Sequence, residues 1–88
     1  MMPIKKHFGA NDYDFTKKRV LVTGANGFVG KHLCKALFQK EAVVIGLLRR
    51  PVDNKCLSEQ HVVDILDEST LRQVIHDVQP EFVVHLAA

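Results

Sequence analysis

Residues 19–30 read RVLVTGANGFVG, and this stretch decides the fold of the chain. It begins with an apolar run without alternation at residues 20–22, which is typical of a central parallel strand covered on both faces. Three glycines spaced three apart follow, and they lead into a segment of helical periodicity. The apolar residues at helical spacing are Val29, Leu33, Leu37 and Phe38. The stretch therefore predicts a buried strand, a glycine loop and a helix over residues 28–40.

A glycine loop between a strand end and a helix start is suited to an anion. The first turn of a helix presents unpaired N–H groups and the positive end of the helix dipole. Glycines at 24 and 27 let the backbone turn tightly and approach a pyrophosphate without an intervening Cβ. Gly30, one turn into the helix, is expected to let the helix pack close on the strand. The spacing G-x-x-G-x-x-G differs from the commoner G-x-G-x-x-G of dinucleotide-binding domains.

The other elements follow from apolar runs and helix signals. Residues 42–48 are expected as a second buried strand, residues 61–63 as a short third strand and residues 82–86 as a fourth. Acidic and capping side chains at residues 67–70 begin a second helix, and Pro80 ends it. The apolar stripe of this helix is Leu71, Val74, Ile75 and Val78. With right-handed crossovers, these elements predict an α/β fold, a Rossmann-like parallel sheet of order 3-2-1-4 with flanking helices, truncated after the fourth strand.

Three blocks of the sequence resemble the extended short-chain dehydrogenase/reductase family, whose epimerases, dehydratases and reductases act largely on nucleotide sugars. The blocks are TGANGFVG from residue 23, the D-x-x-D segment at 64–67 and HLAA at 85–88. Each lies at the end of an expected strand, and the resemblance extends over residues 19–88. It implies an NAD(P)-binding Rossmann domain in which Asp64 contacts the amino group of adenine.

Length and composition bound the chain to one small domain. Its 88 residues, 47% hydrophobic and 25% charged with a net charge of +2, are ordinary for a globular α/β protein. Residues 1–18 are predicted as a flexible leader, with Phe8, Tyr13 and Phe15 folding back on the domain as the alternative. Residues 19–88 are predicted as the N-terminal part of the NAD(P)-binding domain. No membrane span or secretory signal is recognised, so we expect a cytoplasmic location.

Cofactor choice is expected to be decided after the second strand, where Arg49 and Arg50 stand. An acidic residue near this position accepts the ribose 2′-hydroxyl of NAD, whereas an arginine accommodates the 2′-phosphate of NADP. The string GLLRR also resembles that of NADP-using nucleotide-sugar dehydratases of the family. NADP is therefore favoured over NAD. The alternative interpretation is that both arginines are solvated turn residues.

Asp64 has two interpretations that its spacing alone does not separate. It is suited to contact adenine, with Ile65 packed on the ring, and equally suited to mark a turn into the next helix. The family resemblance favours the adenine role. Ala87 and Ala88 leave room for a cofactor at the carboxyl end of the fourth strand. The residues predicted to bind the cofactor are Gly24, Asn26, Gly27, Phe28, Val29, Gly30, Arg49, Arg50, Asp64, Ile65, Leu86, Ala87 and Ala88.

No catalytic residue is predicted within this chain. Members of the family carry a catalytic Tyr-x-x-x-Lys and an upstream Ser or Thr, both beyond the HLAA strand. Tyr13 and Lys17 have the right spacing, but they precede the first strand, and we interpret the match as coincidence. The chain is predicted to be a fragment that binds cofactor at best, from a homodimeric enzyme acting on a nucleotide sugar. The alternatives are a sterol- or flavonoid-type reductase of the same superfamily and a non-catalytic dinucleotide-binding module.

Other classes of site are disfavoured by the pattern of residues. A P-loop requires G-x-x-x-x-G-K-[ST], and ANGFVGKH has Ala25 and His32 at the defining ends. The five histidines lack ligand spacing, so no metal site is expected. Cys34 and Cys56 have no motif spacing and are expected as a buried thiol and a loop thiol. The cations at 17–19 have no partner aromatics, so nucleic acid is not an expected partner.

Overall fold

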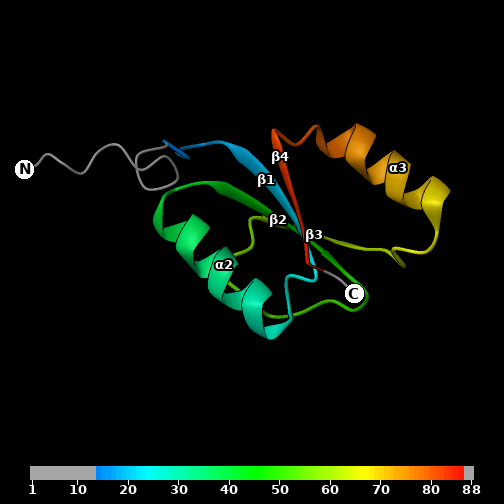
Figure 1. The fold of residues 1–88 in the computed structure, drawn as a ribbon, viewed down its shortest axis with the longest axis horizontal. Coiled ribbons are helices and arrows are strands. Elements are labelled where there is room, and N and C mark those ends of the chain that lie inside the picture. Colours follow the sequence, from blue (N-terminus) through cyan, green and yellow to red (C-terminus); the bar gives the residue numbers. More distant parts are fainter. Residues whose placement is uncertain (1–13, 87–88) are drawn as a thin grey trace, which may run out of the picture.

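The computed structural model describes residues 14–86, which form one parallel sheet with a helix on each face (Figure 1). The elements are β1 (Arg19–Thr23), α2 (Phe28–Gln39), β2 (Val43–Leu48), β3 (Glu59–Val62), α3 (Glu68–Val78) and β4 (Phe82–His85). All three strand pairings are parallel, and the order is β3-β2-β1-β4. The predicted Rossmann-like fold and its strand order are confirmed.

Alternate side chains of the central strands fill two separate apolar layers, one under each helix. The layer on the side of α2 contains Val20, Val22, Ala25, Cys34, Leu37, Ala42, Val44 and Leu48. The layer on the side of α3 contains Leu21, Ile45, Leu47, Val63 and Val78. Because neighbouring residues of a strand point to opposite faces, β1 and β2 must be apolar at every position between the two layers. This is the physical reason for the run without alternation.

The parallel register brings the carboxyl ends of the strands to one edge of the sheet. Thr23, the last residue of β1, pairs with Leu47 of β2 and with His85 of β4. Val62, the last residue of β3, pairs with Leu48. Loops that leave these strands therefore start side by side, which is where open α/β sheets bind their ligands.

The third strand begins earlier than residues 61–63, the predicted range. It runs over Glu59–Val62, and its register places Glu59 beside Ile45 and Val62 beside Leu48. The polar residues EQH gave no apolar signal. An edge strand needs backbone pairing on one side and carries half-exposed side chains, so its pattern is weak. Val63 follows the strand and donates its N–H to the carbonyl of Leu48 at 2.8 Å.

The buried face of α2 also differs from the prediction. The buried residues are Gly30, Cys34 and Leu37, whereas Val29 is 61% and Phe38 is 48% exposed. Leu33 packs partly on the core. The helix is therefore rotated relative to the expected stripe, so that a glycine and a cysteine face the sheet. Small residues at these positions bring the helix close to the loop after β1.

The C-terminal end of each described helix has a residue with left-handed backbone angles. Glu41, with φ of 63°, follows α2 where glycine is common, and its carbonyl accepts the Lys17 N–H at 2.9 Å. Gln79, with φ of 54°, ends α3. The start of α3 is as predicted, because Asp67 accepts the Thr70 N–H at 3.3 Å. Neither described helix has the length and apolar character that a membrane crossing requires.

Segment 14–18 packs on the sheet ahead of β1. Phe15 belongs to the partly buried side chains on the α2 side of the core. Its ring meets that of Phe82 edge to face, with a centroid distance of 5.6 Å. The Lys17 N–H bond to Glu41 also ties this segment to the end of α2. The leader residues 1–13, Tyr13 among them, lie outside the described part.

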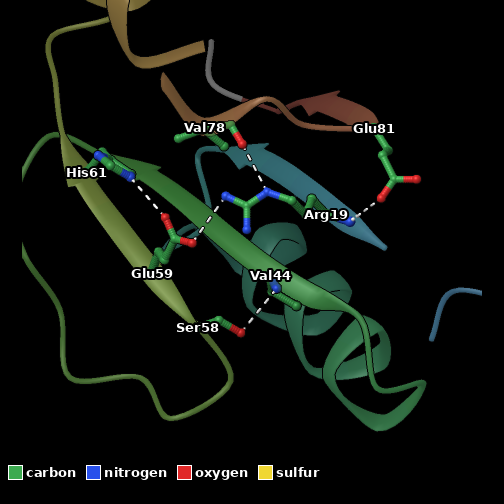
Figure 2. A network of polar contacts seen from close by, with 7 residues as sticks. All are labelled: Arg19, Val44, Ser58, Glu59, His61, Val78 and Glu81. Carbon is green, nitrogen blue, oxygen red and sulfur yellow. Dashed lines mark hydrogen bonds and ion pairs between the residues drawn. The ribbon is translucent and has the colours of Figure 1, made fainter. Parts of the chain in front are cut away.

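A polar network closes the amino-terminal edge of the sheet, opposite the loops after the strands (Figure 2). The Arg19 Nε donates to the carbonyl of Val78 at 2.9 Å, and its terminal nitrogen lies 3.2 Å from the Glu59 carboxylate. The Arg19 N–H donates to the Glu81 carboxylate at 3.1 Å. His61 Nε2 lies 3.4 Å from the other oxygen of Glu59. One side chain thus links β1, β3 and the end of α3.

Candidate functional site

The loop between β1 and α2 depends on two of its glycines. Gly24 has φ of 70°, a left-handed conformation that favours glycine. A Cβ on Gly30 would collide with the Gly24 carbonyl oxygen and would lie 2.9 Å from the backbone of Ala25. The close packing predicted for Gly30 is therefore against the loop backbone, and not against the strand. At Gly27 a Cβ would be 3.4 Å from the Gly24 oxygen, which is ordinary contact.

The start of α2 is open to an anion. Its N-cap residue is Gly27, no side chain of the described residues caps it, and its first turn holds no acidic residue. The N–H groups of the first helical turn have no partner within a helix. Together with the positive end of the helix dipole, they give this loop the properties of a phosphate site.

A cleft of about 690 Å³ lies at the carboxyl edge of the sheet, beside this loop. Five of the residues predicted to bind a cofactor line it, and these are Gly24, Asn26, Arg49, Asp64 and Ile65. They come from the ends of three neighbouring strands. The structure thus brings together residues that are up to 41 positions apart in the chain.

Six other predicted residues do not line this cleft, namely Gly27, Phe28, Val29, Gly30, Arg50 and Leu86. Phe28 is 80% exposed and its ring stacks edge to face on His32, with centroids 4.8 Å apart. Arg50 follows Arg49 in the bend after β2, and its side chain is exposed outside the cleft. The two last predicted residues, Ala87 and Ala88, lie outside the described part.

Seven residues that line the cleft were not predicted as site residues: Thr23, Leu47, Leu48, Val63, Leu66, Leu71 and His85. Several are the last residues of strands or directly follow one. Because parallel strands end at the same edge, the rule that ligands bind there could have found Leu48, Val63 and His85. Leu71 comes from the first turns of α3, and no sequence signal places it near β2.

Asp64 lies at the cleft and also forms the turn into α3. It lines the cleft, and its carboxylate accepts the Leu66 N–H at 3.0 Å. Its carbonyl accepts the Asp67 N–H at 2.8 Å, so the turn into α3 is built on this residue. Asp67 is the helix cap, and hydrogen bonds from the side chain and backbone of Thr70 hold the pKa of its carboxyl below the ordinary value of 3.8.

Thr23 and His85 form the part of the cleft between β1 and β4. The Thr23 side chain is buried, and its Oγ1 lies 2.8 Å from Nδ1 of His85. The same oxygen accepts the Leu86 N–H at 3.0 Å. The imidazole is thereby held by one nitrogen at the edge of the cleft.

A second cleft of about 450 Å³ adjoins the first at Asn26, between α2 and the segment after β2. Lys31 and Lys35 of α2 line one side, and Asp53 and Asn54 line the other. Cationic side chains thus lie next to the glycine loop. Among the described residues, no three His, Cys, Asp or Glu side chains are placed to hold a metal ion.

Both cysteines are free thiols, Cys34 buried and Cys56 half-buried. Burial raises the pKa of the Cys34 thiol to about 11, so it stays protonated at neutral pH. Cys34 acts as a small apolar residue of the core under α2.

The profile of the NAD dependent epimerase/dehydratase family matches residues 20–88. The chain belongs to this family. The match begins in β1 and takes in the glycine loop, the ends of β2 and β3, and β4. The predicted family is therefore confirmed, and its NAD-binding Rossmann fold is the one described above.

Two curated proteins that are similar to this chain are longer than it is. Methionine adenosyltransferase 2 subunit beta of Pongo abelii is 36% identical over 77 residues, which is 88% of this chain and 22% of that protein. UDP-glucose 4-epimerase of Klebsiella pneumoniae is 31% identical over 85 residues, which covers 78% of this chain and 58% of that protein. The chain thus spans less than two thirds of the length of both curated relatives.

A solved structure shares the arrangement of strands and helices of this chain. The enzyme WbmH of Bordetella bronchiseptica, in complex with NAD+, superposes with a TM-score of 0.66 and 32% identity. The alignment covers 83% of this chain and 26% of WbmH.

Proposed function

We propose that this chain forms the part of a cofactor site that binds the adenosine and pyrophosphate of NADP, in an enzyme that acts on a nucleotide sugar. One observation carries the proposal. Gly24 and Asn26 of the glycine loop, Arg49 and the pair Asp64–Ile65 line a single cleft at the carboxyl edge of the sheet.

The order of these groups along the edge fits an extended dinucleotide. Asp64 and Ile65 follow β3, Arg49 follows β2 and Gly24 follows β1, and the three strands are neighbours in this order. A dinucleotide laid across them would meet an acceptor and an apolar contact at its adenine, a cation at its ribose and the helix start at its pyrophosphate. When bound, the nicotinamide of such a cofactor supplies hydride transfer.

The preference for NADP rests on the residue at the end of β2. Arg49 lines the cleft, and the acidic residue typical of NAD sites is not found there. Arg50 does not line the cleft, so Arg49 is the residue we assign to the 2′-phosphate. Asn26 lines both clefts, and the lysines of the second cleft add positive potential beside the glycine loop. WbmH is in complex with NAD+, so the preference of this chain for NADP has to be measured.

The whole enzyme is proposed as a cytoplasmic homodimer whose catalytic Tyr-x-x-x-Lys and substrate-binding residues are supplied by sequence beyond the four strands. The nucleotide-sugar substrate is supported by the relationship to UDP-glucose 4-epimerase. The alternative, a sterol- or flavonoid-type reductase, shares the glycine loop.

The proposal is tested by thermal unfolding of the chain with NADP, with NAD and without nucleotide. A ligand that binds only the folded state adds RT ln(1 + [L]/Kd) to the free energy of unfolding, about 2.7 kcal/mol at a hundredfold excess over Kd. We expect a cooperative transition that NADP raises more than NAD does. A cooperative transition that neither nucleotide shifts would refute the cofactor site, and an equal shift would refute the preference.

A second candidate function is a dinucleotide-binding module without catalysis. It is favoured by the relative of 36% identity, which is named as a subunit of methionine adenosyltransferase. The two candidates differ in the sequence expected beyond residue 88 in the reading frame of the gene. A Tyr-x-x-x-Lys downstream supports the enzyme, and a frame without one supports the module.

A further inference from the structure

His85 lies in the cleft but has no part in the adenosine and pyrophosphate contacts assigned above. It is the last residue of β4, and its exposed side chain lines the cleft together with Thr23 and Gly24. The imidazole is anchored on one side only, by its Nδ1 at 2.8 Å from Thr23 Oγ1. A side chain held in this way has one ring nitrogen left for a ligand.

The chemistry of that nitrogen follows from the hydrogen bonds of Thr23. Its Oγ1 accepts the Leu86 N–H at 3.0 Å and carries a hydroxyl proton that it can donate to Nδ1 of His85. A neutral imidazole that accepts at Nδ1 carries its own proton on Nε2. The structure gives Nε2 no partner among residues 14–86. In the tautomer in which Nδ1 accepts from the Thr23 hydroxyl, the ring presents the Nε2 N–H to the cleft as a donor.

The position of β4 decides which part of a dinucleotide this donor meets. The sheet order is β3-β2-β1-β4, so His85 lies on the far side of the glycine loop from Arg49 and Asp64. Adenine and its ribose belong to the ends of β3 and β2. A group beyond β1 is instead reached by the pyrophosphate and whatever extends past it. Phosphate oxygens are acceptors only, and an N–H donor suits them.

We propose that His85 is a binding residue that donates a hydrogen bond from Nε2 to the pyrophosphate of the dinucleotide, and that Thr23 positions its ring. The inference rests on the proposed function, because it needs a dinucleotide in the cleft. It adds a contact from the β4 side, so that the pyrophosphate is held between the helix start and the imidazole.

The test compares two ligands by calorimetry, NADP and adenosine 2′,5′-bisphosphate. The second ligand retains adenosine, the 2′-phosphate and the adenosine-side 5′-phosphate, but it lacks the second phosphate of the pyrophosphate, which lies farther towards β4, and everything beyond it. His85→Ala is expected to weaken NADP binding about 10- to 100-fold, as for the loss of a hydrogen bond to a charged group. Binding of the bisphosphate is expected to change less than about twofold. His76→Ala, on the exposed face of α3, is the matched control.

Thr23 is tested through the same pair of ligands. Thr23→Val removes the hydroxyl that holds the ring and should weaken NADP selectively, whereas Thr23→Ser keeps the hydroxyl and should bind as the unaltered chain does. If Thr23 had a purely structural role, Thr23→Val would lower the affinity for both ligands together. His85→Gln, which carries an N–H donor at similar reach, is expected to recover part of the affinity.

The ring nitrogens of the unaltered chain give a readout that needs no variant to fold. In a long-range ¹⁵N–¹H spectrum, the Nε2 resonance of His85 should move on addition of NADP and stay in place with the bisphosphate. If the chain binds NADP but His85→Ala binds it equally well and Nε2 does not move, the inference is wrong and the cofactor site stands. If the unaltered chain binds neither ligand, both proposals fall.

Discussion

The Arg19 side chain donates a hydrogen bond from Nε to the carbonyl of Val78 at 2.9 Å, and so joins the first residue of β1 to the last residue of α3. The carbonyl groups in the last turn of a helix have no partner inside the helix. Arg19, at the start of β1, supplies a hydrogen-bond donor to one of these carbonyls (Figure 2). It also brings positive charge to the negative end of the helix dipole. The same guanidinium pairs with Glu59 of β3 at 3.2 Å.

Replacement of Arg19 should therefore weaken the attachment of α3 to the sheet. For Arg19→Ala we expect a loss of about 1–3 kcal/mol in the free energy of unfolding, measured by urea denaturation, because the helix carbonyl and Glu59 both lose a partner. Arg72→Ala is the control. Arg72 pairs with Glu68 at 2.9 Å on the exposed face of α3, and such pairs contribute less than about 0.5 kcal/mol. Equal losses in the two variants would contradict this role of Arg19.

Gly30 and Gly27 should respond very differently to alanine. A methyl group at position 30 meets the Gly24 carbonyl and the Ala25 backbone, neither of which can move aside as a flexible side chain does. Gly30→Ala is expected to cost at least about 3 kcal/mol, at the upper end of overpacking effects, or to prevent folding. Gly27→Ala meets only ordinary contact at 3.4 Å, and its cost should stay below about 1 kcal/mol. Circular dichroism in urea measures both, and similar midpoints would contradict the packing described for the loop.

Replacement of Arg49 and replacement of Arg50 should have different effects on nucleotide affinity. Arg49 lines the cleft and Arg50 does not. If Arg49 holds the 2′-phosphate of NADP, Arg49→Ala should weaken NADP about tenfold or more and leave NAD nearly unchanged, because a charge-assisted hydrogen bond is lost only with NADP. Arg50→Ala is the matched control and should bind both nucleotides normally. A larger effect at Arg50 in the same titrations would move the phosphate contact to that side chain.

Asp67, the N-cap of α3, should make the free energy of unfolding depend on pH in the acidic range. Hydrogen bonds from Thr70 lower the pKa of Asp67 from 3.8 in the folded state. A carboxyl with a depressed folded pKa contributes stability that is present above the unfolded pKa and is lost as pH falls through the folded value. Asp67→Asn keeps a capping oxygen but does not titrate. In urea denaturation at several pH values, the unaltered chain should exceed this variant in stability at neutral pH and lose the advantage below pH 3.8. A constant difference across this range would contradict the prediction.

The order of the sheet, the elements and the family could all be predicted from local patterns. The run at residues 20–22, the glycine triplet and the capping residues before α3 each act through neighbours in the chain. The third strand was placed two residues late because its polar residues are held by pairing with β2, a contact between distant segments. The buried stripe of α2 was misplaced for the same kind of reason, since the approach of Gly30 to the loop sets the rotation of the helix.

The sequence by itself determined where a phosphate-binding loop stands and which residue types come after each strand. Only the tertiary structure decided which of them share a cleft, because that depends on the direction of each side chain at the edge of the sheet. Arg49 enters the cleft while its neighbour Arg50 does not, although the two are alike in sequence. His85 meets Thr23 across 62 residues through the pairing of β4 with β1, a relationship that no local pattern contains.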